Sequence, residues 1–587
     1  MLKIFKHLNA KERLQVALVV VFAVLQVWLD LSIPEYMRRI TVLAQTPGSQ
    51  TGEIVVAGGY MLLCALGSLA CVIIVSFFAS RTSAALSMRL REKLFNKIGG
   101  FSMEEFSRFS TSSLISRSTN DITQVQQFVV SAMQMLLKIP ILAVGGVLGI
   151  LGTGIEWTVA ALIAFAFVLL VVACAMAVVM PQFKKMQALV DKLNLTVRES
   201  LTGRYVVRAF NAEGFHEEKF EAANSGFRRA DQTTNRAMAV MGPVMSLGTN
   251  GVTIAVYVIG ALLINAAGPG EALAVFSNLV VMSFYLALLF NAVKFITKIV
   301  PRFPRAIVSA GRIIEVLETQ PAIVDGALTE GVQGVSGEVT FRDVAFRYPG
   351  AAANALEGVS FTVKQGETVA FIGSTGSGKS TLLNLVMRFF DATGGEVLID
   401  GAAIKDYRIE SLNNKLGYVP QKPVLFQGTI GSNVAYGDNG GGGYSPSDVE
   451  KAIRTARAEE FVLKLEEKMD SAVSQRGANL SGGQKQRLSI ARAVCRKPEI
   501  LIFDDSFSAL DYKTDRELRG ELKNETSGAT RLIVAQRIGT IMDADQIIVL
   551  DGGKIVGKGT HRDLLETCGV YREIAMSQLS EDELNAS

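Results

Sequence analysis

A glycine-rich segment that ends in lysine and serine is the part of the sequence best suited to chemistry. In "ETVAFIGSTGSGKSTLLNLVMRFF", Gly373, Gly378, Lys379 and Ser380 match the pattern G-x-x-x-x-G-K-[ST], between an apolar strand-like run and an amphipathic helix. Glycines let backbone N–H groups point toward phosphates, and the N-terminus of the following helix favours anions. Lys379 supplies a cation, and the Ser380 hydroxyl can bind Mg²⁺. The predicted phosphate-binding residues are Gly373, Ser374, Thr375, Gly376, Ser377, Gly378, Lys379, Ser380 and Thr381.

Two adjacent carboxylates, Asp504 and Asp505, end the apolar run of "ILIFDDSFSALD". The run is typical of a buried strand, and its end is expected beside the glycine-rich loop. Asp504 is therefore the predicted carboxylate that holds Mg²⁺ through water. One aspartate is enough for that role, so the function of Asp505 needs a separate explanation.

A second anion-binding pattern, "LSGGQ", lies between these two motifs and opens the helical pattern "KQRLSIARAV". A serine followed by two glycines at a helix start offers a hydroxyl and open backbone N–H groups. It cannot easily serve the phosphate that the glycine-rich loop already surrounds. We therefore expect a site that is completed between two chains, with the pattern supplied by Leu480, Ser481, Gly482, Gly483 and Gln484.

The elements that position these motifs divide the chain into two parts. The sequence has 587 residues, of which 49% are hydrophobic, and its mean hydropathy of +0.31 is high for a soluble protein. Runs of roughly 20 apolar residues, enough to span a bilayer, occur only before about residue 300. The six predicted spans are 14–33, 55–79, 129–151, 157–180, 240–266 and 273–299. From about residue 337 onward, short strand-like runs alternate with helical patterns, which predicts a soluble α/β domain.

The distribution of Lys and Arg predicts the orientation in the membrane. The loops after the second and fourth spans are long and basic, whereas those after the third and fifth are short and lack both residues. Both termini and the soluble domain are therefore expected in the cytoplasm, although Arg38 and Arg39 in the first outer loop disagree. The long loops should be helical extensions that turn near 106–122 and 202–215. A net charge of +4 gives no reason to expect nucleic acid as a partner.

Cysteines and intramembrane lysines are the remaining candidates for chemistry. The five cysteines (Cys64, Cys71, Cys174, Cys495 and Cys568) show no metal-ligand spacing and are expected to be small buried hydrophobes. Lys138, Lys294 and Lys298 lie in or near membrane runs, where a cation is a candidate for contact with an anionic substrate group. Lys298 could instead extend its charge to the cytoplasmic interface. Phe284, Tyr285 and Phe290 could face cargo, but contact with lipid and helix packing is expected for most of them.

These motifs and spans together resemble the ABC exporters, in the half-transporter form with a membrane domain ahead of the ATPase domain. The resemblance implies an all-α membrane domain of six helices with long cytoplasmic extensions at 1–320, a linker at 321–336, an α/β P-loop ATPase domain at 337–580 and a tail at 581–587. It also implies that ATP and Mg²⁺ are bound, with Tyr348 stacking on adenine and Gln421 and Ser380 at the Mg²⁺. Asp511 would contact the opposite subunit, and "SRSTND" and "VVRAFNAE" match the segments that hold coupling helices. The expected location is the bacterial inner membrane, with several spans.

Two hydrolytic positions, and one position ahead of the signature, depart from the pattern of the family. Asp505 stands where the catalytic glutamate is usual, and Gln536 stands where the switch histidine is usual; Gln475 also replaces a usual glutamate. Asp505 is shorter by one methylene, and a misplacement of about 1 Å can cost on the order of 100-fold in rate. Gln536 keeps a hydrogen-bonding amide but cannot carry a proton. The resemblance is therefore to the degenerate-site subunit of heterodimeric multidrug-type exporters.

The favoured function is ATP-driven export of small amphipathic drugs or lipids from the cytoplasm or the inner leaflet. The expected partner is a second half-transporter with the usual glutamate and histidine, whose competent site would be completed by the "LSGGQ" of this chain. This chain alone is expected to be nearly inactive as an ATPase. Two alternatives remain: the same architecture with a peptide or siderophore as cargo, including import, or a non-transporting ATP-binding regulator or channel.

Overall fold

The computed structural model describes residues 2–46, 48–136, 138–151, 155–268, 271–299, 302–438 and 443–579. By their contacts these residues form two compact units. The first contains 1–99 and 111–319, and the second contains 100–110 and 320–587. The predicted tail at 581–587 lies outside the described residues.

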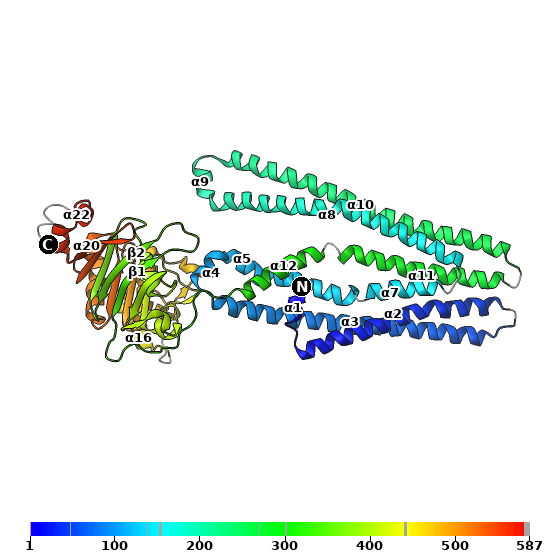
Figure 1. The fold of residues 1–587 in the computed structure, drawn as a ribbon, viewed down its shortest axis with the longest axis horizontal. Helices are drawn as coiled ribbons and strands as arrows, with labels where there is room; N and C mark the ends of the chain where they lie inside the picture. Colours follow the sequence, from blue (N-terminus) through cyan, green and yellow to red (C-terminus); the bar gives the residue numbers. More distant parts are fainter. Residues whose placement is uncertain are drawn as a thin grey trace. The chain divides into compact units, whose positions relative to one another are not determined.

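Unit 1 consists of helices, several of which are very long. Figure 1 shows α8 and α10 running side by side and joined at one end by the short α9, and α2 running beside α3. The elements of this unit are α1 (Leu2–Phe5), α2 (Ala10–Gln45), α3 (Thr51–Gly99), α5 (Thr111–Ser116), η1 (Arg117–Asp121), α6 (Ile122–Ser131), η2 (Ala132–Leu136), α7 (Lys138–Leu151), α8 (Ile155–Thr202), α9 (Arg204–Ala209), α10 (Glu213–Ala266), α11 (Ala272–Ile299) and α12 (Arg302–Glu318).

The long helices extend well beyond the thickness of a bilayer. The 49 residues of α3 give a length of about 74 Å at about 1.5 Å per residue, against a hydrocarbon core of about 30 Å. Among the described residues, five helical stretches are long and apolar enough to span: 10–45, 51–99, 111–151, 246–266 and 272–292. The predicted span 157–180 lies within α8, where many side chains are outside the described part. Large apolar side chains on these helices are exposed, as lipid contact requires.

Polar contacts fix the first two spans of unit 1. Asn9 caps α2, and its backbone N–H donates to Glu12 Oε2 at 2.9 Å. Glu12, only 5% exposed, also pairs with Arg89 of α3 at 2.8 Å. A buried carboxylate without a partner would be costly, so this bidentate pair fixes α2 against α3 at their ends.

A second charged group lies inside the spans. Asp30 Oδ1 accepts a hydrogen bond from Ser68 Oγ at 2.5 Å, and Asp30 Oδ2 pairs with Lys138 Nζ at 3.1 Å. Lys138 therefore has a carboxylate partner within the protein. The side chains of Lys294 and Lys298 lie outside the described part. Tyr285 and Phe290 are buried in the helix packing of α11 with 8% and 2% exposure, rather than facing lipid.

The two cytoplasmic turns differ from each other. Asp121 is 6% exposed and accepts from Ser309 Oγ at 2.7 Å, so it lies inside unit 1 rather than at a docking surface. The segment that packs with unit 2 is 100–110, which contains α4 (Met103–Arg108). There Glu105 Oε1 accepts from the backbone N–H of Ala322 at 2.9 Å. In the other turn, α9 exposes Tyr205, and Phe210 follows it with 77% of its side chain exposed.

Unit 2 is built on two β-sheets. The strand order is β12-β11-β3-β10-β9-β6 in the larger sheet and β2-β1-β4-β5 in the smaller, with β7 and β8 forming a separate pair. Strands β11, β3, β10, β9 and β6 are parallel, and every residue of β9 and β10 is buried. This explains why β9 appears as a continuous apolar run in the sequence, ended by Asp504. The strands are β1 (Val339–Phe346), β2 (Leu356–Val363), β3 (Thr368–Gly373), β4 (Gly394–Ile399), β5 (Ala402–Ala403), β6 (Leu416–Val419), β7 (Gly428–Thr429), β8 (Ala472–Val473), β9 (Ile500–Asp504), β10 (Thr530–Val534), β11 (Gln546–Asp551) and β12 (Lys554–Gly559).

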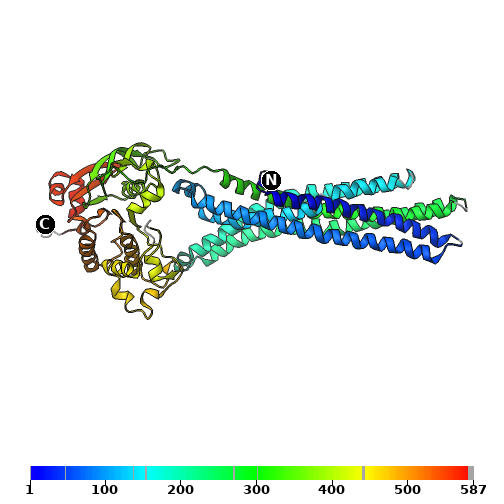
Figure 2. The same cartoon turned by 90° about the horizontal axis from the view of Figure 1, so that it is seen from below.

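Unit 2 also contains helices, and some of them lie away from the smaller sheet. In Figure 2 the yellow helices at 446–462 lie apart from the green strands of the smaller sheet. The helices of the unit besides α4 are α13 (Lys379–Val386), α14 (Ile409–Lys415), α15 (Ile430–Val434), α16 (Pro446–Thr455), α17 (Glu459–Val462), α18 (Gly482–Cys495), α19 (Tyr512–Glu525), α20 (Ile538–Ile541), α21 (His561–Thr567) and α22 (Gly569–Met576), with short 3₁₀ turns η3 (Ile404–Asp406), η4 (Lys468–Asp470) and η5 (Gln475–Gly477).

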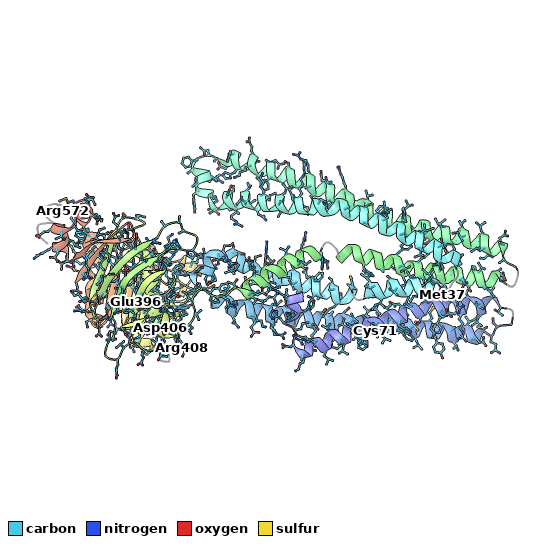
Figure 3. The ribbon with its side chains drawn as sticks, in the orientation of Figure 1. Met37, Cys71, Glu396, Asp406, Arg408 and Arg572 are labelled. Atoms are coloured by element: carbon cyan, nitrogen blue, oxygen red, sulfur yellow. The ribbon has the colours of Figure 1, made fainter. Side chains whose placement is uncertain are left out.

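The residues between 320 and 336 pack along unit 2 and are held by backbone hydrogen bonds. The backbone N–H groups of Gly326 and Val332 donate to the carbonyls of Tyr407 and Asp400 at 3.0 and 2.8 Å. Asp406 and Arg408, labelled in Figure 3, flank the same stretch, and the Arg408 N–H donates to Leu328 O at 2.7 Å. The domain boundaries at 320 and 337 stay predictions.

The cysteines follow the prediction only in part. None of the five forms a disulfide, and Cys71 (labelled in Figure 3), Cys495 and Cys568 are buried. Cys64 is half-buried and Cys174 is exposed, each on a spanning helix. Such exposure on a lipid-facing helix still places a small apolar side chain in an apolar environment.

Candidate nucleotide site

The glycine-rich loop connects the end of β3 to the start of α13 and has the backbone that its glycines allow. Gly376 and Gly378 have φ values of +85° and +101°, which side chains rarely adopt. A Cβ at Gly378 would lie 2.6 Å from Leu356 Cδ2, so the position lacks space as well. The loop thus places a helix N-terminus behind a ring of backbone N–H groups, which favours phosphate.

Lys379, the first residue of α13, turns back over this loop. Its Nζ donates to the carbonyls of Gly373 and Ser374 at 2.8 and 2.7 Å and to Ser377 Oγ at 3.3 Å. Burial lowers the pKa of Lys379, while the charges of Asp505 and Asp504 oppose that shift. The ammonium is therefore a cation held where bound phosphates would lie.

Asp504 ends β9 directly beside the loop, as the parallel order of β3, β10 and β9 requires. Ser380 Oγ donates to Asp504 Oδ1 at 2.9 Å. Burial raises the pKa of Asp504, and the Ser380 hydrogen bond acts in the opposite direction. A serine hydroxyl and a carboxylate in contact form a pair of hard oxygen ligands of the kind that Mg²⁺ prefers.

Asp505 is held by two amides through one oxygen. Gln421 Nε2 and Gln536 Nε2 both donate to Asp505 Oδ2, at 3.1 and 2.8 Å. The residue is 7% exposed and has a left-handed backbone with φ of +48°, which aspartate tolerates better than most side chains. Burial raises the pKa of Asp505, and hydrogen bonds from Gln421, Gln536 and Ser508 oppose the shift. Asp505 is thus fixed in place by its neighbours.

A single cavity of about 860 Å³ brings most of the predicted site residues together. Ser377 is covered at 1% exposure and lies beneath the loop. Tyr348 Oη lies 3.0 Å from Thr381 Oγ1, and its ring packs edge-on against Phe390 at 5.3 Å. The predicted residues that line the cavity are Tyr348, Gly373, Ser374, Thr375, Gly376, Gly378, Lys379, Ser380, Thr381, Gln421, Asp504, Asp505 and Gln536.

The cavity also has a wall that the sequence did not indicate. Val570, Glu573, Ile574, Ser577 and Gln578, in or just after α22, line the same space. These residues are about 200 positions from the glycine-rich loop, and no local motif marks them. Only the tertiary packing of α22 could have identified them.

The signature residues do not line this cavity. Ser481 caps α18, where its Oγ accepts from the Gln484 N–H at 3.3 Å and its own N–H donates to Gln484 Oε1 at 2.9 Å. A Cβ at Gly482 would meet nothing within 4 Å, and Gly483 would meet only ordinary contacts. The backbone at the start of α18 is therefore not covered by side chains of this chain, so a ligand or a second subunit could contact it.

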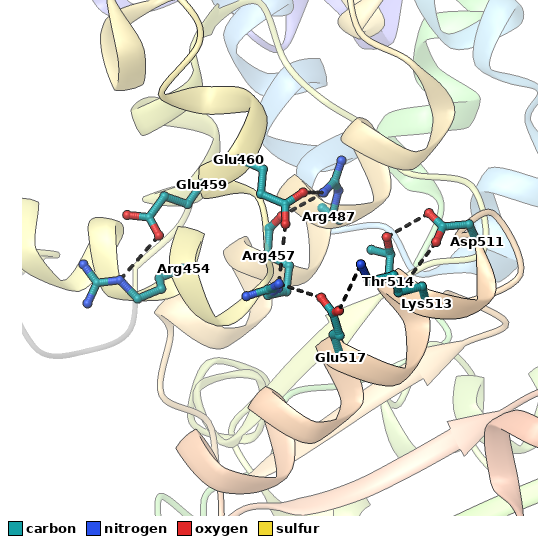
Figure 4. A network of polar contacts seen from close by, with 9 residues as sticks. All are labelled: Arg454, Arg457, Glu459, Glu460, Arg487, Asp511, Lys513, Thr514 and Glu517. Atoms are coloured by element: carbon teal, nitrogen blue, oxygen red, sulfur yellow. Dashed lines mark hydrogen bonds and ion pairs between the residues drawn. The ribbon is translucent and has the colours of Figure 1, made fainter.

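A network of charges supports α18 and the residue predicted to contact the opposite subunit (Figure 4). Arg487 of α18 donates to the carbonyl of Arg457 at 2.8 Å, and Arg457 pairs with Glu517 of α19 at 2.6 Å. Asp511 caps α19 by accepting from the Thr514 N–H at 3.0 Å. The network therefore connects α18, which carries the signature, to α19, which Asp511 caps.

The residues present fit ATP and Mg²⁺. The donor set of Ser380, Asp504 and Gln421 is oxygen-rich, and the described residues contain no cluster of three His, Cys, Asp or Glu side chains that would suit another metal. When bound, Mg²⁺ would neutralise charge on the phosphates. Lys379 and the loop N–H groups would then bind the phosphates, and Asp505 and Gln536 line the same cavity.

Comparisons with known proteins extend over nearly the whole chain. The family model described as the ABC transporter transmembrane region matches 16–292, and the one described as ABC transporter matches 356–508. An ABC transporter ATP-binding protein of Mycobacterium tuberculosis is 38% identical over 89% of this chain and 87% of its own length. An ATP-dependent lipid A-core flippase of Aromatoleum aromaticum is 32% identical over 86% of this chain and 82% of its own length.

A solved structure gives the same answer for the fold. The structure of a bacterial Atm1-family ABC exporter with ATP bound matches 98% of this chain and 99% of that chain, with a TM-score of 0.80 and 26% identity. The predicted fold class, a helical membrane domain followed by an α/β ATPase domain, is confirmed. So are the assignments as a transport ATPase and as a multi-pass membrane protein with a cytoplasmic ATPase domain. This chain belongs to the ABC transporters, as an exporter half-transporter with its membrane and ATPase domains in one polypeptide.

Proposed function

We propose that this chain is the degenerate-site subunit of a heterodimeric exporter that moves amphipathic drugs or lipids out of the cytoplasm or the inner leaflet. Its own nucleotide site binds Mg²⁺ and ATP but hydrolyses slowly. Its signature residues, Ser481 to Gln484, complete the competent site of a partner half-transporter. Lipid as a substrate class is supported by relatives that are named ATP-dependent lipid A-core flippases.

The observation that carries this proposal is the arrangement around Asp505. Its carboxylate is one methylene shorter than the usual glutamate, and its Oδ2 accepts hydrogen bonds from two amides, Gln421 and Gln536. Those hydrogen bonds occupy Oδ2 and hold the short carboxylate in place, so this oxygen is less free to accept a proton from a water at the position that a glutamate would reach. Gln536 cannot accept a proton in place of a histidine.

The residues expected to bind ATP and Mg²⁺ around Asp505 are all present. We therefore expect this site to lose hydrolysis without losing binding. Lys379, Ser380 and Asp504 keep the contacts that phosphate and Mg²⁺ need. The capped α18 keeps its open glycines. A homodimer of this chain would contain two sites that hydrolyse ATP slowly, so neither signature would complete a fast site. In a heterodimer, a partner with glutamate and histidine provides one fast site, and the signature of this chain completes it.

The test is the ATPase rate of the full-length chain purified alone in lipid nanodiscs. We expect tight Mg²⁺-dependent ATP binding with turnover about 100-fold below that of a typical exporter, since a base displaced by about 1 Å costs on the order of 100-fold. Lys379→Ala should abolish the binding and serves as the control for site occupancy. Turnover on the order of 1–10 s⁻¹ from the lone chain would contradict the heterodimer.

A further inference from the structure

The end of the chain contacts the segment that carries the switch position. We call Gln536, Arg537 and Ile538 the switch segment. Gln578 Nε2 donates to the carbonyl of Gln536 at 2.8 Å, and Gln578 Oε1 accepts from the N–H of Ile538 at 2.9 Å. One side-chain amide therefore pairs with the backbone on both sides of Arg537.

The switch segment in turn contacts the reacting part of the site. The Gln536 side chain donates to Asp505 Oδ2 at 2.8 Å. Arg537 donates to the carbonyl of Ser508 at 3.2 Å, which lies between Asp505 and Asp511. Three consecutive residues thus connect Gln578 to the Asp505 carboxylate and to the loop that leads to Asp511.

Gln578 is itself held in position by the fold. Tyr571 and Ala575 of α22 are fully buried, and Tyr571 Oη lies 2.7 Å from His561 Nδ1 of α21. The N–H groups of Gln578 and Leu579 both donate to the carbonyl of Ala575, at 3.0 and 2.9 Å. The helix therefore ends in a fixed turn that presents the Gln578 amide to the switch segment.

We propose that Gln578 is a positioning residue for ATP hydrolysis and nucleotide retention, acting through Gln536 on Asp505. A glutamine is suited to this task because one amide offers both a donor and an acceptor at a fixed spacing. The carbonyl of Gln536 needs a donor and the N–H of Ile538 needs an acceptor, and the Gln578 amide provides both. The role does not depend on whether the opposite subunit is a second copy or another chain, so it stands apart from the proposed heterodimer.

The test uses the full-length chain in the assembly it forms, with variants Gln578→Ala, Gln536→Ala and both together. Release of the fluorescent analogue mant-ATP with Mg²⁺ and single-turnover hydrolysis are measured. Loss of two hydrogen bonds should change either rate at this chain's own site by about 3- to 10-fold. The steady-state turnover of the whole assembly is a different quantity and is not the readout here. The double variant should be no worse than the more affected single variant, because both act on one path. Effects that multiply, or a Gln578→Ala variant equal to wild type, would overturn the proposal.

A second measurement separates positioning from general stability. Gln578→Glu keeps an acceptor for the Ile538 N–H but loses the donor to the Gln536 carbonyl. Hydrogen exchange of the peptide that contains Ile538 should be slow in wild type and Gln578→Glu and faster in Gln578→Ala. Met576→Ala, at an exposed site on the same helix, is the matched control and should leave exchange and nucleotide release unchanged. Equal exchange in all variants would refute the contact as a restraint.

Discussion

At the scale of single residues, the site separates the groups that bind nucleotide from the group that would hydrolyse it. The binding groups have the contacts that their chemistry needs, from the Lys379 ammonium to the Ser380 and Asp504 oxygens. Asp505 instead accepts hydrogen bonds from the side-chain amides of Gln421 and Gln536. The consequences of mutating the two kinds of residue should therefore differ.

The clearest difference should be between Gly482 and Asp505. In the assembly with its partner, Gly482→Val should reduce ATP turnover about 100-fold or more, because a side chain there blocks contact with the partner's nucleotide and removes donors needed in the transition state. A Cβ at Gly482 would have no atom of this chain within 4 Å, so the thermal stability of the Gly482→Val variant should equal that of the wild type. Asp505→Asn should change turnover less than about threefold, given the slow site proposed above.

The same comparison tests how Asp505 is used. Ser481→Arg should behave like Gly482→Val, since it removes the hydroxyl at the start of α18. Asp505→Glu with Gln536→His should raise hydrolysis if the partner's signature closes over this site. If Asp505→Asn were as damaging as Ser481→Arg, Asp505 would be a working base and the proposed asymmetry would be wrong.

The raised pKa of Asp504 predicts a pH dependence of Mg²⁺-dependent binding. Burial favours the protonated carboxyl, so protons compete with Mg²⁺ at a higher pH than for an ordinary aspartate. Affinity for Mg²⁺ and ATP should be full at neutral pH and fall as the pH drops, before ordinary carboxylates titrate. Binding of ATP in EDTA, and Mg²⁺–ATP binding by Asp504→Asn, should lack this fall. Parallel curves for wild type and Asp504→Asn would exclude Asp504 as the titrating group.

At the scale of elements, the sequence predicted those whose signals are local. The continuous apolar run of β9 and the glycine pattern before α13 identified both elements and placed Asp504 beside Ser380, because parallel strands end on one edge of a sheet. The amide pairing of Gln421 and Gln536 on Asp505, the docking of 100–110 with 320–587, and the Gln578 contact join residues far apart in the chain. No periodicity reports such pairs, and the contact between Asp121 and Ser309 is another pair of this kind.

The α9 turn provides a test of coupling between the domains. Tyr205, Val206 and Phe210 are exposed there, with 81%, 62% and 77% of each side chain accessible, although the segment is cytoplasmic by its charge pattern. An apolar cluster of this kind in water is suited to a protein contact. Phe210→Ser should reduce transport at least fivefold while ATP hydrolysis persists, because force must pass through that contact. Phe215→Ser, on neighbouring α10, is the comparison variant with similar exposure.

Transport in proteoliposomes and ATPase activity must be measured on the same preparation. An equal loss of transport and hydrolysis in Phe210→Ser, with normal assembly, would place α9 in the ATPase cycle itself rather than in coupling. An equal effect of Phe215→Ser would show that apolar exposure on this hairpin matters in general and not the turn in particular.

At the scale of the whole molecule, an exporter must hold charge inside the bilayer without losing its fold. In α2, α3 and α7 the charges are paired within the protein. Asp30 of α2 accepts a hydrogen bond from Ser68 of α3 and forms an ion pair with Lys138 of α7. Asp30 and Lys138 side chains are only 18% and 22% exposed. Neither charge is tolerable alone at that depth, so the pair links the first span to the third.

Removing one charge should therefore destabilise the molecule more than removing both. Lys138→Ala should lower the free energy of unfolding by about 3 kcal/mol, because Asp30 is left buried and unpaired. Asp30→Asn with Lys138→Gln keeps hydrogen-bonding groups without charge and should recover most of that loss, to within about 1 kcal/mol. Unfolding of the full-length protein in detergent, with Lys3→Ala as an exposed control that also breaks an ion pair, measures the difference. A double variant as unstable as Lys138→Ala would mean that the pair stabilises the fold through packing rather than through compensation of charge.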